Sequence, residues 1–139
     1  MPTPGYSGTP LPKKLGLKSP MTLAAIGAPK DYHGWLGPLP DGLRIVSAAG
    51  PAPEAVHLFV TRRAEMKKHL VALRKQLVPA GFVWVSWPKK SSGVETDITE
   101  DTIREVALPL GFVDIKVCAV SDVWSGLKLV IRKTERTRA

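Results

Sequence analysis

The hydrophobic pattern is clearest in the middle of the chain, where it predicts a strand, a helix and a second strand. Positions 55–60 and 82–87 carry mainly apolar and aromatic side chains in succession, as in strands that are covered on both faces. Between them Met66, Leu70 and Leu73 recur at helical spacing and form one apolar stripe. These three elements predict a βαβ unit with a right-handed crossover.

Shorter patterns on either side of this unit extend the same arrangement. They predict strands at 21–26, 43–47, 113–119 and 127–131, and helices at 29–36 and 97–110. The last helix is expected to start with a capping box, in which Asp97 caps the helix and Glu100 follows three residues later. The last two strands are expected to form an antiparallel hairpin through the turn at 121–126.

The segment 48–54 joins the second strand to the third without a helical pattern. A parallel crossover usually needs about 10–12 residues or more, so either the second strand runs antiparallel or an extended linker crosses the sheet. We favour the linker. The fold class predicted is therefore α/β, a three-layer Rossmann-like sheet that is mostly parallel and ends in an antiparallel hairpin.

The length and composition agree with one globular domain. The 139 residues include 44% hydrophobic and 23% charged side chains. We expect a disordered arm at 1–10, a single domain at 11–133 and a basic tail at 134–139. The absence of a long apolar run and of a secretory signal pattern at the N-terminus predicts a cytoplasmic protein with no membrane partner.

The net charge of +8 lies mostly near the two termini in the sequence. Lys13, Lys14 and Lys18 precede the first strand, and four of the last eight residues are basic. This distribution favours solvated tails, with a weak, salt-sensitive contact to a polyanion as the alternative. It does not indicate a basic face on the folded domain.

Few residues indicate a particular chemistry. The three histidines lack a metal-ligand spacing, Cys118 is expected to pack as a small apolar residue, and no catalytic group can be assigned. One candidate site is the loop that follows the strand at 82–87, where Trp87, Pro88, Lys89, Lys90 and Ser91 could hold an anion. The alternative for this loop is simple exposure to solvent.

The order of predicted elements resembles that of the class I methyltransferases, which use S-adenosylmethionine. The resemblance implies an abridged methyltransferase-like topology and a cofactor site at the ends of the first two strands. The corresponding residues are Gly27, Ala28 and Pro29 after the first strand and Ser47 at the end of the second. Thr61 after the third strand and Trp124 in the last turn complete the set of candidate ligand-binding residues.

Two departures from the methyltransferase pattern weaken the implied cofactor site. Only Gly27 stands where that family has a glycine-rich turn, and Ser47 stands where it has a carboxylate that binds the ribose hydroxyls. Losing such charge-assisted hydrogen bonds would cost about 1.5–3 kcal/mol, or one to two decades of affinity.

At a finer level the chain resembles a family of small uncharacterised bacterial proteins, a domain of unknown function. The matching segments cover about residues 11–133. They are 12–16, 26–29, 56–60, 85–94, 99–101, 104–111, 117–120 and 124–128. This likeness implies the methyltransferase-like fold and brings no activity.

Three functions are therefore expected in order. The first is a non-catalytic binding or regulatory protein on a methyltransferase-like scaffold. The second is a methyltransferase with a degenerate cofactor motif, for which S-adenosylmethionine would be the cofactor. The third is a nucleic-acid accessory protein that acts through its basic tails.

Overall fold

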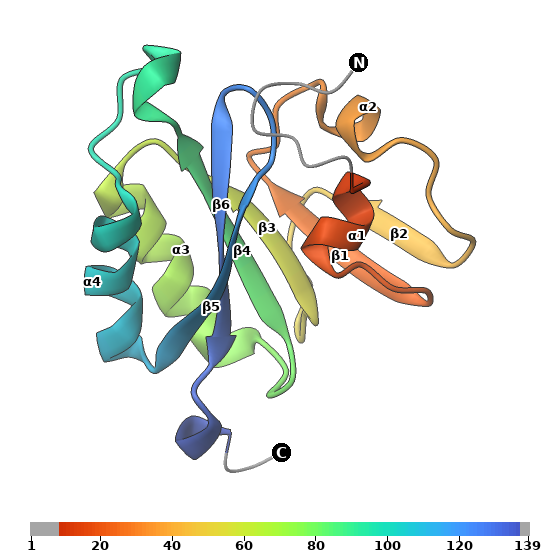
Figure 1. The fold of residues 1–139 in the computed structure, drawn as a ribbon. Helices are drawn as coiled ribbons and strands as arrows, with labels where there is room; N and C mark the ends of the chain where they lie inside the picture. Colours follow the sequence, from red (N-terminus) through yellow and green to blue (C-terminus); the bar gives the residue numbers. More distant parts are fainter. Residues whose placement is uncertain (1–8, 137–139) are drawn as a thin grey trace.

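A computed structural model describes residues 9–136 of the chain, and Figure 1 shows their arrangement. The expected disordered arm lies almost wholly outside these residues. The helices are α1 (Leu11–Leu15), α2 (Tyr32–Leu36), α3 (Arg63–Gln76) and α4 (Glu100–Leu110), with short 3₁₀ turns η1 (Lys90–Ser92) and η2 (Lys133–Glu135). The strands are β1 (Met21–Ile26), β2 (Leu43–Val46), β3 (Ala55–Phe59), β4 (Phe82–Pro88), β5 (Phe112–Ala119) and β6 (Trp124–Ile131).

The six strands form one mixed sheet in the order β2-β1-β3-β4-β6-β5. Strands β2, β1, β3 and β4 are parallel, whereas β6 pairs antiparallel with both β4 and β5. Two predictions are thereby confirmed: β2 is parallel to β1, so residues 47–54 form the expected linker across the sheet, and the last two strands form an antiparallel hairpin.

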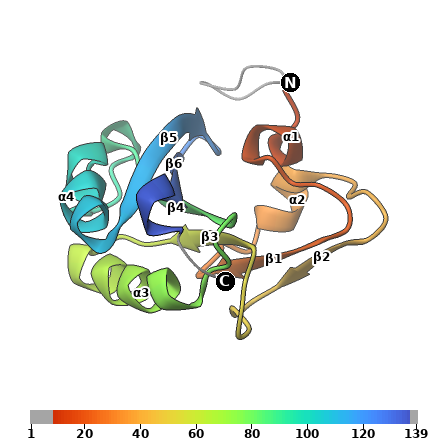
Figure 2. The same cartoon turned by 90° about the horizontal axis from the view of Figure 1, so that it is seen from below.

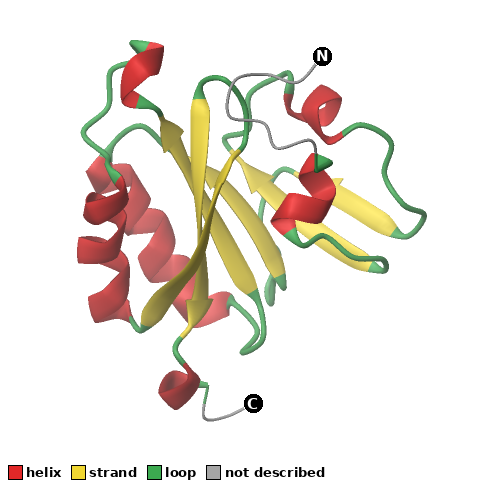
Figure 3. Ribbon diagram, viewed as in Figure 1, coloured by secondary structure: helices red, strands yellow, loops and turns green. Residues whose placement is uncertain are grey.

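Helices cover both faces of the sheet, which gives the three predicted layers (Figures 2 and 3). Helices α3 and α4 pack on one face, where Leu58, Leu70 and Ile103 belong to one buried cluster. Helices α1 and α2 cover the other face, where Leu15 and Trp84 belong to a second cluster. Every residue of β3 and β4 is buried because these strands lie between the two clusters.

One local prediction is wrong, namely the residue that caps α4. Helix α4 is capped by Thr99, whose side chain accepts from the Thr102 N–H, and not by Asp97. Asp97 instead accepts a hydrogen bond of 2.7 Å from the backbone N–H of Arg63 at the start of α3. Strand β4 ends at Pro88, one residue beyond the predicted bound, because Pro88 still pairs with Trp124, and the next backbone N–H, that of Lys89, donates to Val123.

None of the helices in the described part of the chain has the length and apolar character of a membrane span. Buried apolar side chains lie on β1, β3, β4, β5 and β6 and on the helices beside them, whereas in β2 only Leu43 is buried. The carboxyl ends of the four parallel strands meet at one edge. This edge positions the candidate site.

Candidate functional site

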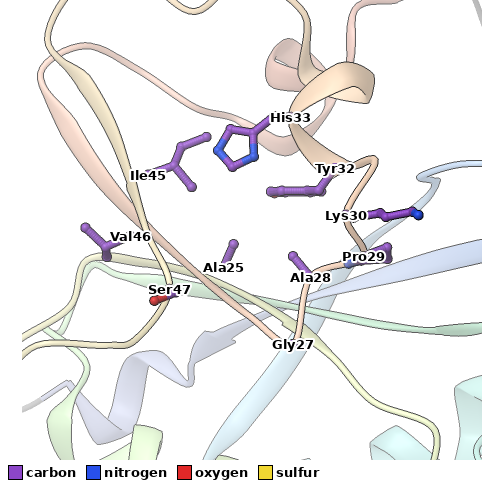
Figure 4. Close-up of a pocket in the computed structure, with 10 residues that line it drawn as sticks. All are labelled: Ala25, Gly27, Ala28, Pro29, Lys30, Tyr32, His33, Ile45, Val46 and Ser47. Atoms are coloured by element: carbon purple, nitrogen blue, oxygen red, sulfur yellow. The ribbon is translucent and has the colours of Figure 1, made fainter.

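A pocket of about 700 Å³ lies between α2 and the carboxyl ends of β1 and β2. This volume falls in the usual range for small-molecule sites. The lining residues are Ala25, Gly27, Ala28, Pro29, Lys30, Tyr32, His33, Ile45, Val46 and Ser47. Figure 4 shows the His33 and Tyr32 side chains on the α2 side, opposite Ile45 and Val46, with Lys30 directed away from them.

The pocket lies beside the point where the strand order reverses. Strand β2 lies on one side of β1 and the next strand in sequence, β3, lies on the other. In open α/β sheets ligands bind in the crevice at such a switch point. The linker at 47–54 crosses the sheet here and so leaves the ends of β1 and β2 without a long helix above them.

Gly27 makes the turn that leads from β1 to α2. Its φ of +70° is in the left-handed region, and a Cβ at this position would lie 2.9 Å from the carbonyl oxygen of Phe59. A side chain would therefore be strained and would clash with β3. Glycine is required here to bring the turn close to the switch point.

The wall of the pocket at the end of β2 carries a hydroxyl group and no carboxylate. Ser47 is exposed and directly follows Ile45 and Val46, whose side chains are half-buried. None of the lining residues is acidic. A ribose bound at this edge would meet the neutral Ser47 hydroxyl and would find no charged acceptor there.

Below the pocket a buried hydrogen-bonded chain connects three elements. The Tyr32 hydroxyl lies 2.7 Å from His57 Nδ1, and His57 Nε2 lies 2.7 Å from the Ser86 hydroxyl. Burial lowers the pKa of His57 to about 3 and raises the pKa of the Tyr32 phenol, so both groups are neutral at pH 7. The Phe59 ring stacks on His57 at 4.2 Å and fixes its plane.

The hydrogen bonds from Tyr32 to His57 and from His57 to Ser86 therefore hold the α2 wall of the pocket in place. Tyr32 contributes to the pocket lining while its hydroxyl is held by His57 on β3. Neither His57 nor Ser86 is exposed to solvent, so they act on the pocket only through Tyr32.

The candidate residues after the third and fourth strands lie outside this pocket. The Thr61 carbonyl accepts hydrogen bonds from Thr96 and Asp97. Trp87 is 8% exposed and belongs to the core on the α3 and α4 face. Pro88 is buried in the sheet, and the Lys89 N–H donates to Val123 at 2.7 Å.

The polar part of this loop is open to solvent. Lys90 and Ser91 form part of η1 and are exposed. Ile26 ends β1 and Trp87 lies next to the end of the parallel strand β4 at the same edge of the sheet, but β3 lies between those strands. The loop is therefore near the edge that carries the pocket without lining it.

Trp124 and Cys118 pack against the buried cluster on the α1 and α2 face of the sheet. The Trp124 ring meets the Phe59 ring edge-on at 5.1 Å, and Cys118 packs against the same cluster. Burial raises the pKa of the Cys118 thiol, although Lys14 and Lys116 oppose this effect. The thiol is therefore mainly protonated at neutral pH.

Six pocket residues were not among the sequence candidates: Ala25, Lys30, Tyr32, His33, Ile45 and Val46. Tyr32 and His33 could have been found, because they occupy the first turn after the Gly27 turn, as residues near a ligand do in such folds. Ala25, Ile45 and Val46 look like ordinary strand residues. Within the described residues no three His, Cys, Asp or Glu side chains come close enough to hold a metal ion.

Comparison with solved structures shows a methyltransferase-like fold. A protein from Sulfolobus solfataricus described as a candidate type 11 methyltransferase aligns with a TM-score of 0.59 at 15% identity, over 90% of this chain and 91% of its own. LepI in complex with SAM aligns with a TM-score of 0.54 at 10% identity, over 88% of this chain and 39% of its own. The chain thus spans about two fifths of LepI.

A third similar structure is the fibrillarin pre-rRNA processing protein of Methanococcus jannaschii, with a TM-score of 0.51 at 11% identity, over 89% of this chain and 69% of its own. No protein-family profile matches the sequence, and no curated protein matches it either. At these identities the similarity concerns the fold alone. The chain is an α/β protein with the methyltransferase-like fold, in which β2, β1, β3 and β4 form the parallel part and β6 the antiparallel strand.

Proposed function

We propose that this protein is a small S-adenosylmethionine-dependent methyltransferase that binds its cofactor between α2 and the ends of β1 and β2. The observation that carries the proposal is the pocket of about 700 Å³ beside the Gly27 turn, at the switch point of a methyltransferase-like sheet. LepI, which has a similar fold, is described in complex with SAM.

The lining residues suit an adenosine group. His33 and Tyr32 face Ile45 and Val46 across a slot that could receive a flat purine ring. Ser47 could donate to or accept from a ribose hydroxyl. The cofactor would supply an activated methyl group, and the residues around it would bind and orient it without a catalytic side chain of their own.

The expected affinity is modest because Ser47 replaces a carboxylate. Restoring a charge-assisted hydrogen bond to a ribose should strengthen binding by roughly one decade, the equivalent of about 1.4 kcal/mol. We therefore predict that Ser47→Asp binds S-adenosylmethionine and S-adenosylhomocysteine about tenfold more tightly than the natural chain. Isothermal titration calorimetry measures both affinities.

A matched variant, Thr134→Asp, adds the same charge at an exposed position in η2 and should leave affinity unchanged. If neither ligand bound the natural chain or Ser47→Asp at millimolar concentration, the proposed site would be wrong. If Ser47→Asp and Thr134→Asp changed affinity equally, the effect would be one of net charge and not of the pocket.

Binding without methyl transfer is a second candidate function. It is favoured by the lone glycine in the β1 turn and by the neutral end of β2, both of which weaken the cofactor site. Incubation of the protein with radiolabelled S-adenosylmethionine and a host-cell extract separates the two functions. A labelled product supports the methyltransferase, whereas binding without any labelled product supports a regulatory protein.

The finer likeness to uncharacterised bacterial proteins and the cytoplasmic location stay predictions. The likeness rests on the segments within 11–133, and the location on the composition of the chain.

A further inference from the structure

Two lysines lie directly opposite each other on the antiparallel strands β5 and β6. Lys116 is the register partner of Lys128, so both side chains lie on the same face of the sheet. Like charges at directly opposed positions destabilise a sheet. Because the Lys116–Lys128 pair does not stabilise the fold, we looked for a ligand that these two positive charges could bind.

The segment that contains α1 brings further lysines to this face. Lys14 donates a hydrogen bond of 2.8 Å from Nζ to the carbonyl of Ala119 on β5. Lys18 lies in the loop after α1, two residues beyond Gly16, at which a Cβ would lie 3.2 Å from Lys128 Nζ. Burial, together with Lys116 and Lys18, lowers the pKa of Lys128. Figure 2 shows α1 beside the ends of β5 and β6. We call Lys14, Lys18, Lys116 and Lys128 the lysine surface.

The lysine surface belongs to the folded domain and not to a tail. Leu11 and Leu15 of α1 are buried against the sheet, and the Leu15 carbonyl accepts a hydrogen bond of 2.9 Å from Trp84 Nε1. Lys128 extends over the Phe82 ring, with Nζ 4.4 Å from the ring centroid. The packing therefore fixes the positions of the charges before any ligand arrives.

Acidic residues are scarce around the lysine surface. No Asp or Glu precedes Asp31 in the sequence, and Asp122 is the only one in the segment 115–131. The five salt bridges found among residues 9–136 involve Arg62, Arg74 and Arg104. The acidic side chains in them belong to α4, β5, η2 and the loop before α4, and they pair with these arginines.

We propose that the lysine surface binds the phosphodiester backbone of a nucleic acid. Ammonium groups on separate segments suit a row of phosphates, which they would contact with release of counterions. Protein interfaces are by contrast depleted in lysine. The rings nearest to the surface, Phe82 and Trp84, are buried under Lys128, so the contact reads the backbone and not the bases.

The test measures binding of the full chain to a fluorescent DNA duplex of about 20 base pairs and to a single-stranded RNA of about the same length, over a series of salt concentrations. Lys18→Gln combined with Lys116→Gln removes two exposed charges without removing a buried group. We expect an affinity roughly tenfold or more lower at about 0.1 M salt, and a log–log salt slope less steep by about 1.8 for the duplex.

The matched control is Lys67→Gln combined with Lys68→Gln, two exposed lysines of α3 on the opposite face. It removes the same charge and should retain most of the affinity. Thermal unfolding confirms that each variant folds. Titration with S-adenosylmethionine should give the same affinity in both double variants, because none of these lysines lines the pocket.

Four results would overturn the proposal. The first is no binding of the natural chain to either nucleic acid at about 0.05 M salt, and the second is equal losses in the two double variants. The third is displacement of the nucleic acid by an equal charge of polyglutamate, which would assign the surface to an acidic protein. The fourth is a loss caused only by Arg136→Gln with Arg138→Gln, which would assign the contact to the C-terminal tail instead.

Discussion

His57 is a titratable side chain that the fold keeps neutral by enclosing it between Tyr32 and Ser86. Its pKa is lowered to about 3 in the folded chain, whereas an unfolded chain would have the ordinary value near 6.5. Below pH 6.5 the unfolded state therefore binds a proton that the folded state does not. The stability that a neutral His57 provides is complete above about pH 6.5 and is lost progressively as the pH falls towards 3.

We predict that the free energy of unfolding falls by up to about 1.4 kcal/mol per pH unit through this group between about pH 6 and pH 4. Urea denaturation at a series of pH values measures the slope. In His57→Gln, which keeps a hydrogen-bonding side chain, the dependence of the unfolding free energy on pH should become weaker. The loss should correspond to nearly one proton taken up on unfolding, or up to about 1.4 kcal/mol per pH unit. His33→Gln, at an exposed position, should keep the original slope, and an unchanged slope in His57→Gln would contradict the assignment.

At the scale of single elements, the start of α4 shows what local sequence can and cannot determine. Asp97 and Glu100 have the spacing of a capping box, but so do Thr99 and Thr102 in the structure. Asp97 is engaged by the Arg63 N–H, from a residue 34 positions away in sequence. No local pattern reveals such a tertiary contact.

Thr99→Ala should therefore lower the free energy of unfolding by about 1 kcal/mol, because the Thr102 N–H at the first turn of α4 loses its acceptor. Thermal or chemical denaturation measures the change. Thr134→Ala, at an exposed position in η2, is a suitable control and should have little effect. Equal stability of Thr99→Ala and the natural chain would show that Thr99 does not cap the helix.

The sequence was most informative for strands with continuous apolar runs and for helices with one apolar stripe. Strands β3 and β4 were predicted because burial on both faces requires a continuous run of apolar residues. Helix α3 was predicted because burial on one face requires apolar residues at helical spacing. The pocket was predicted in part: Gly27 marks a turn by its residue type, whereas Ile45 and Val46 have no chemical signature. The lysine surface was missed because its members come from three distant segments.

At the scale of the whole molecule, stability is distributed unevenly over the sheet. Strands β3 and β4 are buried on both faces, whereas β2 is a four-residue edge strand with exposed or half-buried positions after Leu43. We predict that backbone amides of β2 and α2 exchange with deuterated solvent much faster than those of β3 and β4. Mass spectrometry of peptides after timed exchange measures this difference.

Addition of S-adenosylhomocysteine should slow exchange in α2 and β2 while leaving β3 and β4 unchanged, because a ligand that binds only to the folded state stabilises the elements that line its pocket. Uniform exchange across the sheet would contradict the uneven distribution. Protection of the η1 loop instead of α2 would move the site to the Trp87–Ser91 segment.

The eight-residue linker at 47–54 has a consequence for how such a fold can vary. It connects β2 to β3 with little regular structure of its own, while β1 pairs directly with both strands. The length of the linker can therefore change at small entropic cost. Insertions in this segment could place a new lid above the pocket while the remaining core keeps its packing.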